Sequence, residues 1–173
     1  RSWLGEDLDR FEQVLESSTA PVKVQLCGPW TWAASVEDGA GRRLLRDEAF
    51  VADLADALGL AAADHVREVA RRLPGRPVVL QLDEPGLPAI LAGAIPTTSG
   101  LGRLAAVPAA QAMAALHQVT SAVGGPVVLH CCGGGLFDVA RSGGFEGVSW
   151  DATVSLDDTI GDDVAETAEA GVG

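Results

Sequence analysis

The residues of this sequence best suited to chemistry are three in a row, His130, Cys131 and Cys132, which follow an apolar run and precede a glycine-rich stretch. Imidazole nitrogen and thiolate sulfur are favoured zinc donors, and zinc in proteins is almost always four-coordinate. Because side chains alternate along a strand, His130 and Cys132 should point one way and Cys131 the other, into the packing layer. The alternative is a structural one, in which all three are buried core residues at a strand end.

The elements that must position this pair can be predicted from hydrophobic periodicity and turn residues. Four apolar runs at 22–27, 77–82, 126–130 and 147–150 predict strands, and helices are expected at 4–16, 47–73, 87–92, 108–123, 135–141 and 158–170. Strands that are apolar on both faces and separated by helices indicate a parallel sheet in an α/β domain.

Each predicted strand ends in polar or metal-binding residues, as expected at the active face of a TIM (β/α)8 barrel. The strand ends read Cys27-Gly28-Pro29, Asp83-Glu84-Pro85, His130-Cys131-Cys132 and Asp151. No Gly-x-Gly-x-x-Gly or P-loop pattern follows the first strand, which argues against a nucleotide-binding doubly wound sheet. We therefore predict one domain over 1–173, a barrel of the TIM type of which this chain contains a part.

In such a barrel the strand ends converge on one centre, so Asp151 could join His130 and Cys132 as a third zinc ligand. An open zinc site can hold a substrate thiol as the thiolate, which is the nucleophilic form. Asp83 and Glu84 would then supply negative charge for an ammonium group on that substrate. Their structural alternative is a helix N-terminal cap with a solvated carboxylate.

Composition excludes several functional classes. The net charge is −12, from 24 acidic and 12 basic residues, which argues against nucleic acid or an anionic membrane surface as a partner. Three cysteines, two of them adjacent, cannot build a disulfide framework. No apolar stretch approaches the roughly 18 residues of a membrane span. A reducing cytoplasm is the expected compartment, where clustered cysteines more often bind metal or act in catalysis.

The ends of the sequence suggest a piece of a longer chain. It begins at Arg1 without an initiator methionine and stops at Gly171-Val-Gly173, where a further strand should begin. Four strands should leave two unpaired edges and an uncovered apolar face, so we predict that the segment is not a closed barrel.

Three strand-end segments resemble a known family, the catalytic barrel of cobalamin-independent methionine synthase. The wider group includes uroporphyrinogen decarboxylase and the coenzyme M methyltransferases. Gln25-Leu-Cys-Gly-Pro-Trp-Thr31 resembles the family's strand ending in Thr-Gly-Pro-x-Thr. Val79-Leu-Gln-Leu-Asp-Glu-Pro85 is similar to its Ile-Gln-Ile-Asp-Glu-Pro segment, and His130-Cys-Cys132 to its His-x-Cys zinc pair.

The resemblance implies zinc-dependent methyl transfer to the thiol of homocysteine, with a folate-type methyl donor. It implies that His130 and Cys132 ligate zinc and that Asp83 holds the homocysteine amino group. Asp151 falls where the family has a glutamate ligand. The family's second zinc cysteine and catalytic histidine would come from strands after Gly173, so no catalytic residue is assigned here.

Three alternatives remain open at this point. A related thiol methyltransferase with a corrinoid methyl donor would use the same His-x-Cys pair. A metal-binding or assembly protein could keep the site without turnover. A decarboxylase-like barrel without metal would use Cys131 and Cys132 as core residues.

Overall fold

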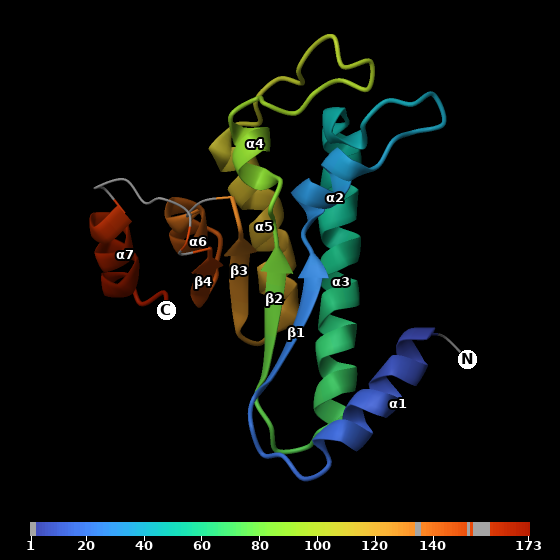
Figure 1. Cartoon of the computed structure of the whole chain (residues 1–173), viewed down its shortest axis with the longest axis vertical. Helices are drawn as coiled ribbons and strands as arrows, with labels where there is room; N and C mark the ends of the chain where they lie inside the picture. The colour runs from blue at the N-terminus through green and yellow to red at the C-terminus, as the bar shows by residue number, and fades with distance from the viewer. Residues whose placement is uncertain (1–2, 134–135, 152, 154–159) are drawn as a thin grey trace.

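The structure is a computed structural model that describes residues 3–133, 136–151, 153 and 160–173. Four parallel strands form one sheet in the order β1-β2-β3-β4, and helices separate successive strands (Figure 1). The strands are β1 (Val22–Cys27), β2 (Val78–Asp83), β3 (Val127–Cys131) and β4 (Gly147–Trp150). The predicted α/β class and all four strands are therefore confirmed. The described sheet is open, so the barrel itself stays a prediction.

Most helices lie within two residues of their predicted bounds. Asp47 caps the longest one, as expected, by accepting a hydrogen bond from the Phe50 amide. The predicted helices at 135–141 and 158–170 each begin on residues outside those described. The helices are α1 (Trp3–Leu15), α2 (Pro29–Ser35), the 3-10 helix η1 (Leu44–Arg46), α3 (Glu48–Arg72), α4 (Leu87–Leu91), α5 (Ala109–Val123), α6 (Phe137–Ser142) and α7 (Ile160–Glu169).

One helix of the site region, α2, is absent from the sequence prediction. In the sequence, Gly28-Pro29 predicts the end of the first strand and nothing more, whereas Pro29 occupies the first turn of α2, where its missing N–H costs nothing. The burial of Trp30, Ala33 and Ala34 follows the helical spacing i, i+3, i+4. A seven-residue helix is too short for that spacing to stand out in the sequence.

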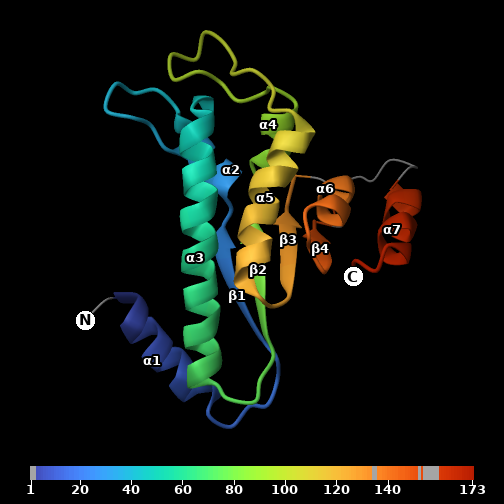
Figure 2. The same ribbon diagram turned by 180° about the vertical axis from the view of Figure 1, so that it is seen from behind.

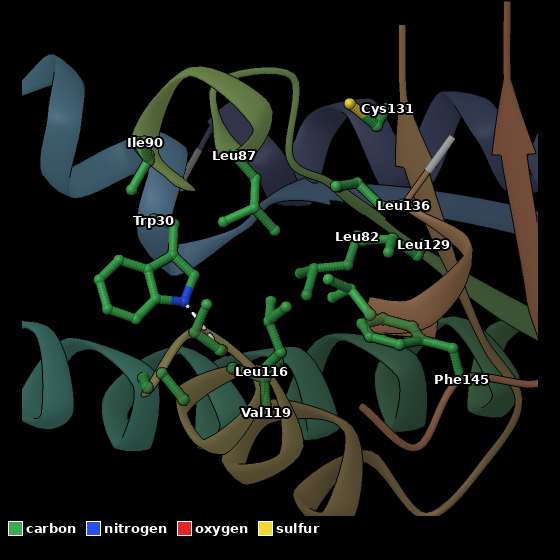
Figure 3. Close-up of a cluster of buried hydrophobic side chains, with 14 of the residues drawn as sticks. Trp30, Leu82, Leu87, Ile90, Leu116, Val119, Leu129, Cys131, Leu136 and Phe145 are labelled. Atoms are coloured by element: carbon green, nitrogen blue, oxygen red, sulfur yellow. Dashed lines mark hydrogen bonds between the residues drawn. The ribbon is translucent and has the colours of Figure 1, made fainter. Parts of the chain in front are cut away.

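Helices α3 and α5 cover one face of the sheet (Figures 1 and 2). Leu80, Leu82 and Leu129 on this face are fully buried in one cluster with α5 residues such as Leu116 and Val119. Figure 3 shows Leu82 and Leu129 beside these two α5 residues. This apolar layer stabilises the fold, because full burial of each leucine contributes about 1.5 to 3 kcal/mol.

The opposite face carries no described helix and is not the apolar surface that we expected. Its positions include Lys23 and Gln25 on β1, Gln81 on β2 and His130 on β3, together with half-buried valines. The prediction was wrong because the runs that look continuously apolar in the sequence contain polar residues at alternate positions. Those positions all fall on the same face of a sheet in register.

The last residues lie beside β4. The Gly173 amide donates to the Glu146 carbonyl, and the Val148 amide donates to the Gly173 carbonyl. This pair of bonds has the pattern of a parallel ladder, so 171–173 occupy part of the β4 edge.

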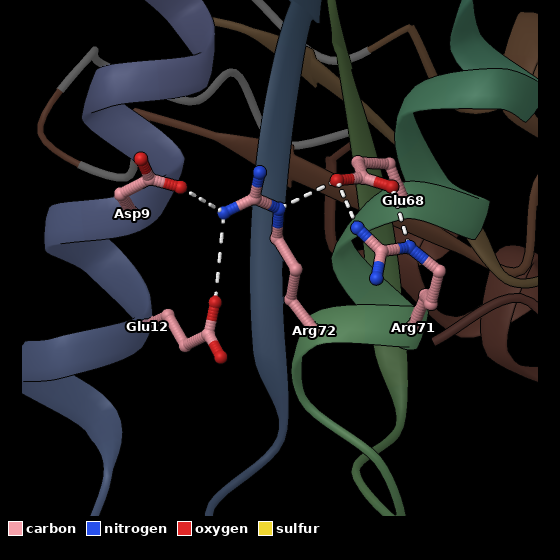
Figure 4. A network of polar contacts seen from close by, with 5 residues as sticks. All are labelled: Asp9, Glu12, Glu68, Arg71 and Arg72. Carbon is pink, nitrogen blue, oxygen red and sulfur yellow. Dashed lines mark hydrogen bonds and ion pairs between the residues drawn. The ribbon is translucent and has the colours of Figure 1, made fainter.

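Helix α1 closes the opposite end of the sheet from the strand tips (Figure 1). Its residues Leu8, Phe11 and Leu15 pack against a small apolar cluster around Val22 and Val69. Beside that cluster, Arg72 of α3 pairs with three carboxylates, Asp9, Glu12 and Glu68, and so links α1 to α3 (Figure 4).

Among the described residues, no helix combines the length and the apolar character needed to cross a membrane.

Candidate metal and substrate site

A row of four polar side chains crosses the sheet at the strand tips. Cys27 on β1 is the partner of Asp83, Asp83 is the partner of His130, and His130 is the partner of Ser149. Neighbouring strands lie about 4.8 Å apart, so each side chain in the row stands beside the next on the face without helices. The parallel register therefore brings together residues that are widely separated in sequence.

His130 is held at both ring nitrogens. Its Nε2 lies 3.0 Å from Cys132 Sγ, and its Nδ1 lies 3.1 Å from Ser149 Oγ. Cys131, between them in sequence, is fully buried on the helix side, whereas Cys132 is exposed. The predicted alternation is thus confirmed, and His130 and Cys132 lie side by side, whereas their role as zinc ligands stays a prediction.

This arrangement fits two of the four donors of a zinc site. Two tetrahedral zinc ligands of these types stand about 3.5 Å apart, close to the observed separation of His130 Nε2 and Cys132 Sγ. A hydroxyl on the second imidazole nitrogen, here Ser149, is the kind of outer contact that orients a ligating histidine. The described residues contain no group of three histidine, cysteine or carboxylate side chains placed to hold a metal.

Asp151 follows β4 and is exposed. Its Oδ1 accepts hydrogen bonds from the amide and the hydroxyl of Thr153, and these bonds lower the pKa of the carboxyl. The carboxylate therefore stays ionised over the working pH range of most proteins. It is not gathered with His130 and Cys132 in the described structure, and its role as a zinc ligand stays a prediction.

Asp83 stands at the end of a short hydrogen-bond chain on the same face. Lys23 Nζ donates to Gln81 Oε1 at 2.5 Å, and Gln81 Nε2 donates to Asp83 Oδ1 at 2.6 Å. Among the described residues no donor reaches Asp83 Oδ2. Asp83 is consequently oriented through one oxygen, and its other oxygen is free to accept a hydrogen bond from a ligand.

Glu84, the next residue, points the opposite way and is fully buried. Its Oε1 accepts from the Trp30 amide at 2.9 Å, and its Oε2 accepts from the amide and hydroxyl of Thr31 at 2.7 and 2.6 Å. The Thr31 hydroxyl in turn accepts from the Gly86 amide. Glu84 therefore caps α2 from the neighbouring strand, which is the structural alternative, although the carboxylate is buried and not solvated.

Burial raises the pKa of Glu84 to about 7, against the opposing effect of the Thr31 and Trp30 hydrogen bonds. Gly28 lies close to Glu84, because a Cβ added at Gly28 would stand 2.3 Å from Glu84 Oε1. Both carboxylate oxygens of Glu84 already accept hydrogen bonds from protein donors. Glu84 therefore has no free acceptor oxygen for the substrate-binding role that the sequence predicts.

The thiol of Cys27 lies in the same row as Asp83, but its pKa is shifted in the opposite direction from that of a metal-bound cysteine. Burial, followed by the charges of Glu84 and Asp83, raises the pKa of the Cys27 thiol. Burial likewise raises the pKa of Cys131. Both thiols stay protonated near neutral pH, and neither is prepared to act as a nucleophile.

The sequence prediction named Cys27 at a strand end without giving it a role, and it missed three members of this site: Ser149, Gln81 and Lys23. Each could have been found by extending the period-two alternation backward from the strand tips. Ser149 precedes Asp151 by two residues, and Gln81 precedes Asp83 by two. What the pattern could not supply is the register between strands, which decides which residues become neighbours.

Comparisons with known proteins add no family assignment. No family model matches the chain, and no curated protein matches it.

Proposed function

We propose that the chain belongs to a zinc-dependent methyltransferase that moves a methyl group onto the thiol of homocysteine or a similar amino thiol. The observation that carries this proposal is the convergence of His130 Nε2 and Cys132 Sγ, 3.0 Å apart, beside Asp83 on the adjacent strand. The likeness of three strand-end segments to cobalamin-independent methionine synthase supports the same reaction.

Each residue of the site has a separate task in this proposal. His130 and Cys132 hold the metal, with Asp151 as a proposed third ligand, and Ser149 fixes the imidazole ring through Nδ1. Zinc, when bound there, supplies a lowered pKa for the substrate thiol and so a nucleophilic sulfur at neutral pH. Asp83 Oδ2 accepts a hydrogen bond from the substrate ammonium, while Gln81 keeps Oδ1 in place.

Zinc content of matched cysteine variants tests the metal site. We expect about one zinc per chain in freshly purified protein. Cys132→Ala should lose the zinc, whereas Cys131→Ala should keep it, because Cys131 faces the core. Equal loss in the two variants would contradict the alternation that selects Cys132. Less than about half a zinc per chain in the unmodified protein would contradict the metal site itself.

A pair of substrates tests the role of Asp83. Asp83→Asn should raise the KM for homocysteine by about 10- to 100-fold, because a charge-assisted hydrogen bond contributes about 1.5 to 3 kcal/mol. The KM for 4-mercaptobutyrate, which lacks the amino group, should not change. An equal rise for both thiols would show that Asp83 has no part in ammonium recognition.

The methyl donor can be assigned in the same assay. We propose a folate-type donor, and methyl transfer from 5-methyltetrahydrofolate is the expected result. Transfer from methylcobalamin alone would favour the alternative corrinoid-dependent methyltransferase, which would use the same His130 and Cys132 pair.

A further inference from the structure

A cavity of about 250 Å³ lies between the segment that contains η1 and the segment that joins α4 to α5. Both segments extend from the end of the sheet toward which the strands point (Figures 1 and 2). The buried indole of Trp30 contributes to its lining. Because none of its lining residues belongs to the strand-tip row, the cavity is a second site, separate from the proposed zinc site.

The two walls of this cavity are hydrogen-bonded structures. In one, Pro96 pairs with Arg103 in an antiparallel bridge, and the Leu104 amide donates to the Ile95 carbonyl. In the other, a similar bridge joins Glu37 to Arg43. Such bonds fix the backbone on both sides, as in the largely preformed pockets that bind small molecules.

Two arginines, Arg46 and Arg103, line the cavity from opposite walls. Neither is in an ion pair with any described residue. Arg103 Nη1 donates to the Ala94 carbonyl, and no described acceptor bonds the Arg46 side chain. In a chain with twice as many acidic as basic residues, two guanidinium groups without a carboxylate partner are available to bind an external anion.

Two further features of the lining favour an organic anion. Leu45, Val51, Leu104 and Val107 supply apolar surface beside Trp30. The 15-residue helix α5 begins at the cavity after Pro108 without a side-chain cap, so its positive end faces the same space. The single lining carboxylate, Glu48, lies in the first turn of α3.

We propose that this cavity binds a small organic anion in which a carboxylate or phosphate head is attached to an apolar body. The head lies between Arg46 and Arg103, and the body packs toward Trp30 and Leu104. The volume of about 250 Å³ suits a body about the size of one aromatic ring.

Calorimetric titration of the whole 173-residue chain tests the proposal with three probes: benzoate, phenyl phosphate and the neutral benzamide. We expect saturable one-site binding of at least one anion with a Kd of about 1 mM or tighter. Benzamide should bind at least about tenfold more weakly, and raising the salt from about 50 to 300 mM should weaken the anion further. Binding of benzamide equal to that of the anions, or no saturable binding by any probe, would overturn the proposal.

Variants locate the binding in the cavity. Arg46→Gln and Arg103→Gln should each weaken anion binding by about tenfold, because each removes one charge-assisted contact. The control is Arg67→Gln, which removes an equal charge from the exposed face of α3, where Arg67 pairs with Asp64. Arg103→Gln also removes the hydrogen bond to the Ala94 carbonyl, which could disturb the cavity wall. Arg103→Lys is therefore the second variant at this position, because it keeps the positive charge. Equal affinity in all variants would overturn the assignment of the site.

Discussion

Alternate residues of the same strands serve two different faces of the sheet. On the face against α3 and α5, Leu80, Leu82 and Leu129 are fully buried and belong to one apolar cluster. On the other face, Asp83 and His130 lie in a row and are oriented by hydrogen bonds to neighbouring side chains. Apolar packing is therefore concentrated on one face and hydrogen-bonded polar side chains on the other, so a substitution on one face should have little effect on the properties of the other.

The largest expected effect is on the helix-covered face. Leu129→Ala should lower the free energy of unfolding by about 2 to 5 kcal/mol, because it leaves a cavity in a well-packed core. The adjacent residue is a matched control, since Val128→Ala on the other face should cost about 1 kcal/mol. Urea unfolding measures both values, and an equal loss of unfolding free energy in the two variants would contradict the distinction between the two faces.

The buried carboxylate of Glu84 is the polar exception on the covered side, and it gives stability a pH dependence. Its pKa is raised from 4.5 to about 7, so between these pH values the folded state binds more protons than the unfolded chain. The free energy of unfolding should therefore fall as pH rises through this window, by on the order of 3 kcal/mol.

Glu84→Gln isolates this contribution, because an amide does not titrate. The free energy of unfolding is measured against pH for the variant and for the unmodified protein. The unmodified protein minus the variant should decline between pH 4.5 and 7 and stay constant above that range. The exposed Glu37→Gln is the control and should keep the decline. A variant that declines as steeply as the unmodified protein would assign the dependence to another group.

A smaller loss is expected where the backbone approaches Glu84. Gly28→Ala places a Cβ 2.3 Å from Glu84 Oε1, so the cap on α2 must shift, at a cost of about 1 to 3 kcal/mol. Gly125→Ala is the control, because nothing lies within 4 Å of its added Cβ. Thermal unfolding compares the two, and a neutral Gly28→Ala would show that Glu84 moves freely.

The smallest expected effect concerns the polar face and depends on the proposed metal site. Ser149→Ala should weaken zinc binding by about tenfold, because the second nitrogen of His130 loses the contact that orients the ring. Competition with a chromogenic chelator measures the affinity. Stability should change little, and a large loss of stability with unchanged zinc affinity would reverse the roles of the two faces.

The sequence alone was sufficient for the four strands, for the helices other than α2 and η1, and for the closeness of His130 to Cys132. All of these depend on periodicity within one segment, 3.6 in helices and 2 in strands. The hydrogen bond from the Phe50 amide to the Asp47 carboxylate was also predictable, since an N-cap acts within three residues.

The contacts that join different segments could not be predicted. Glu84 caps a helix that follows another strand, so its partners lie 53 and 54 residues away. Ser149 reaches His130 through the β3–β4 register, and the Lys23 to Gln81 bond crosses from β1 to β2. Each requires the relative placement of two strands, which no local pattern in either segment encodes.

The register of β3 also bears on how faithfully the chain folds. A slip of one residue would turn Leu129 and Cys131 toward solvent and drive His130 and Cys132 against α5. Such a misfolded state would lose apolar burial and trap polar side chains without partners at the same time. The alternation of apolar and polar residues thus also disfavours this misfolded state, because a one-residue slip of β3 is penalised twice.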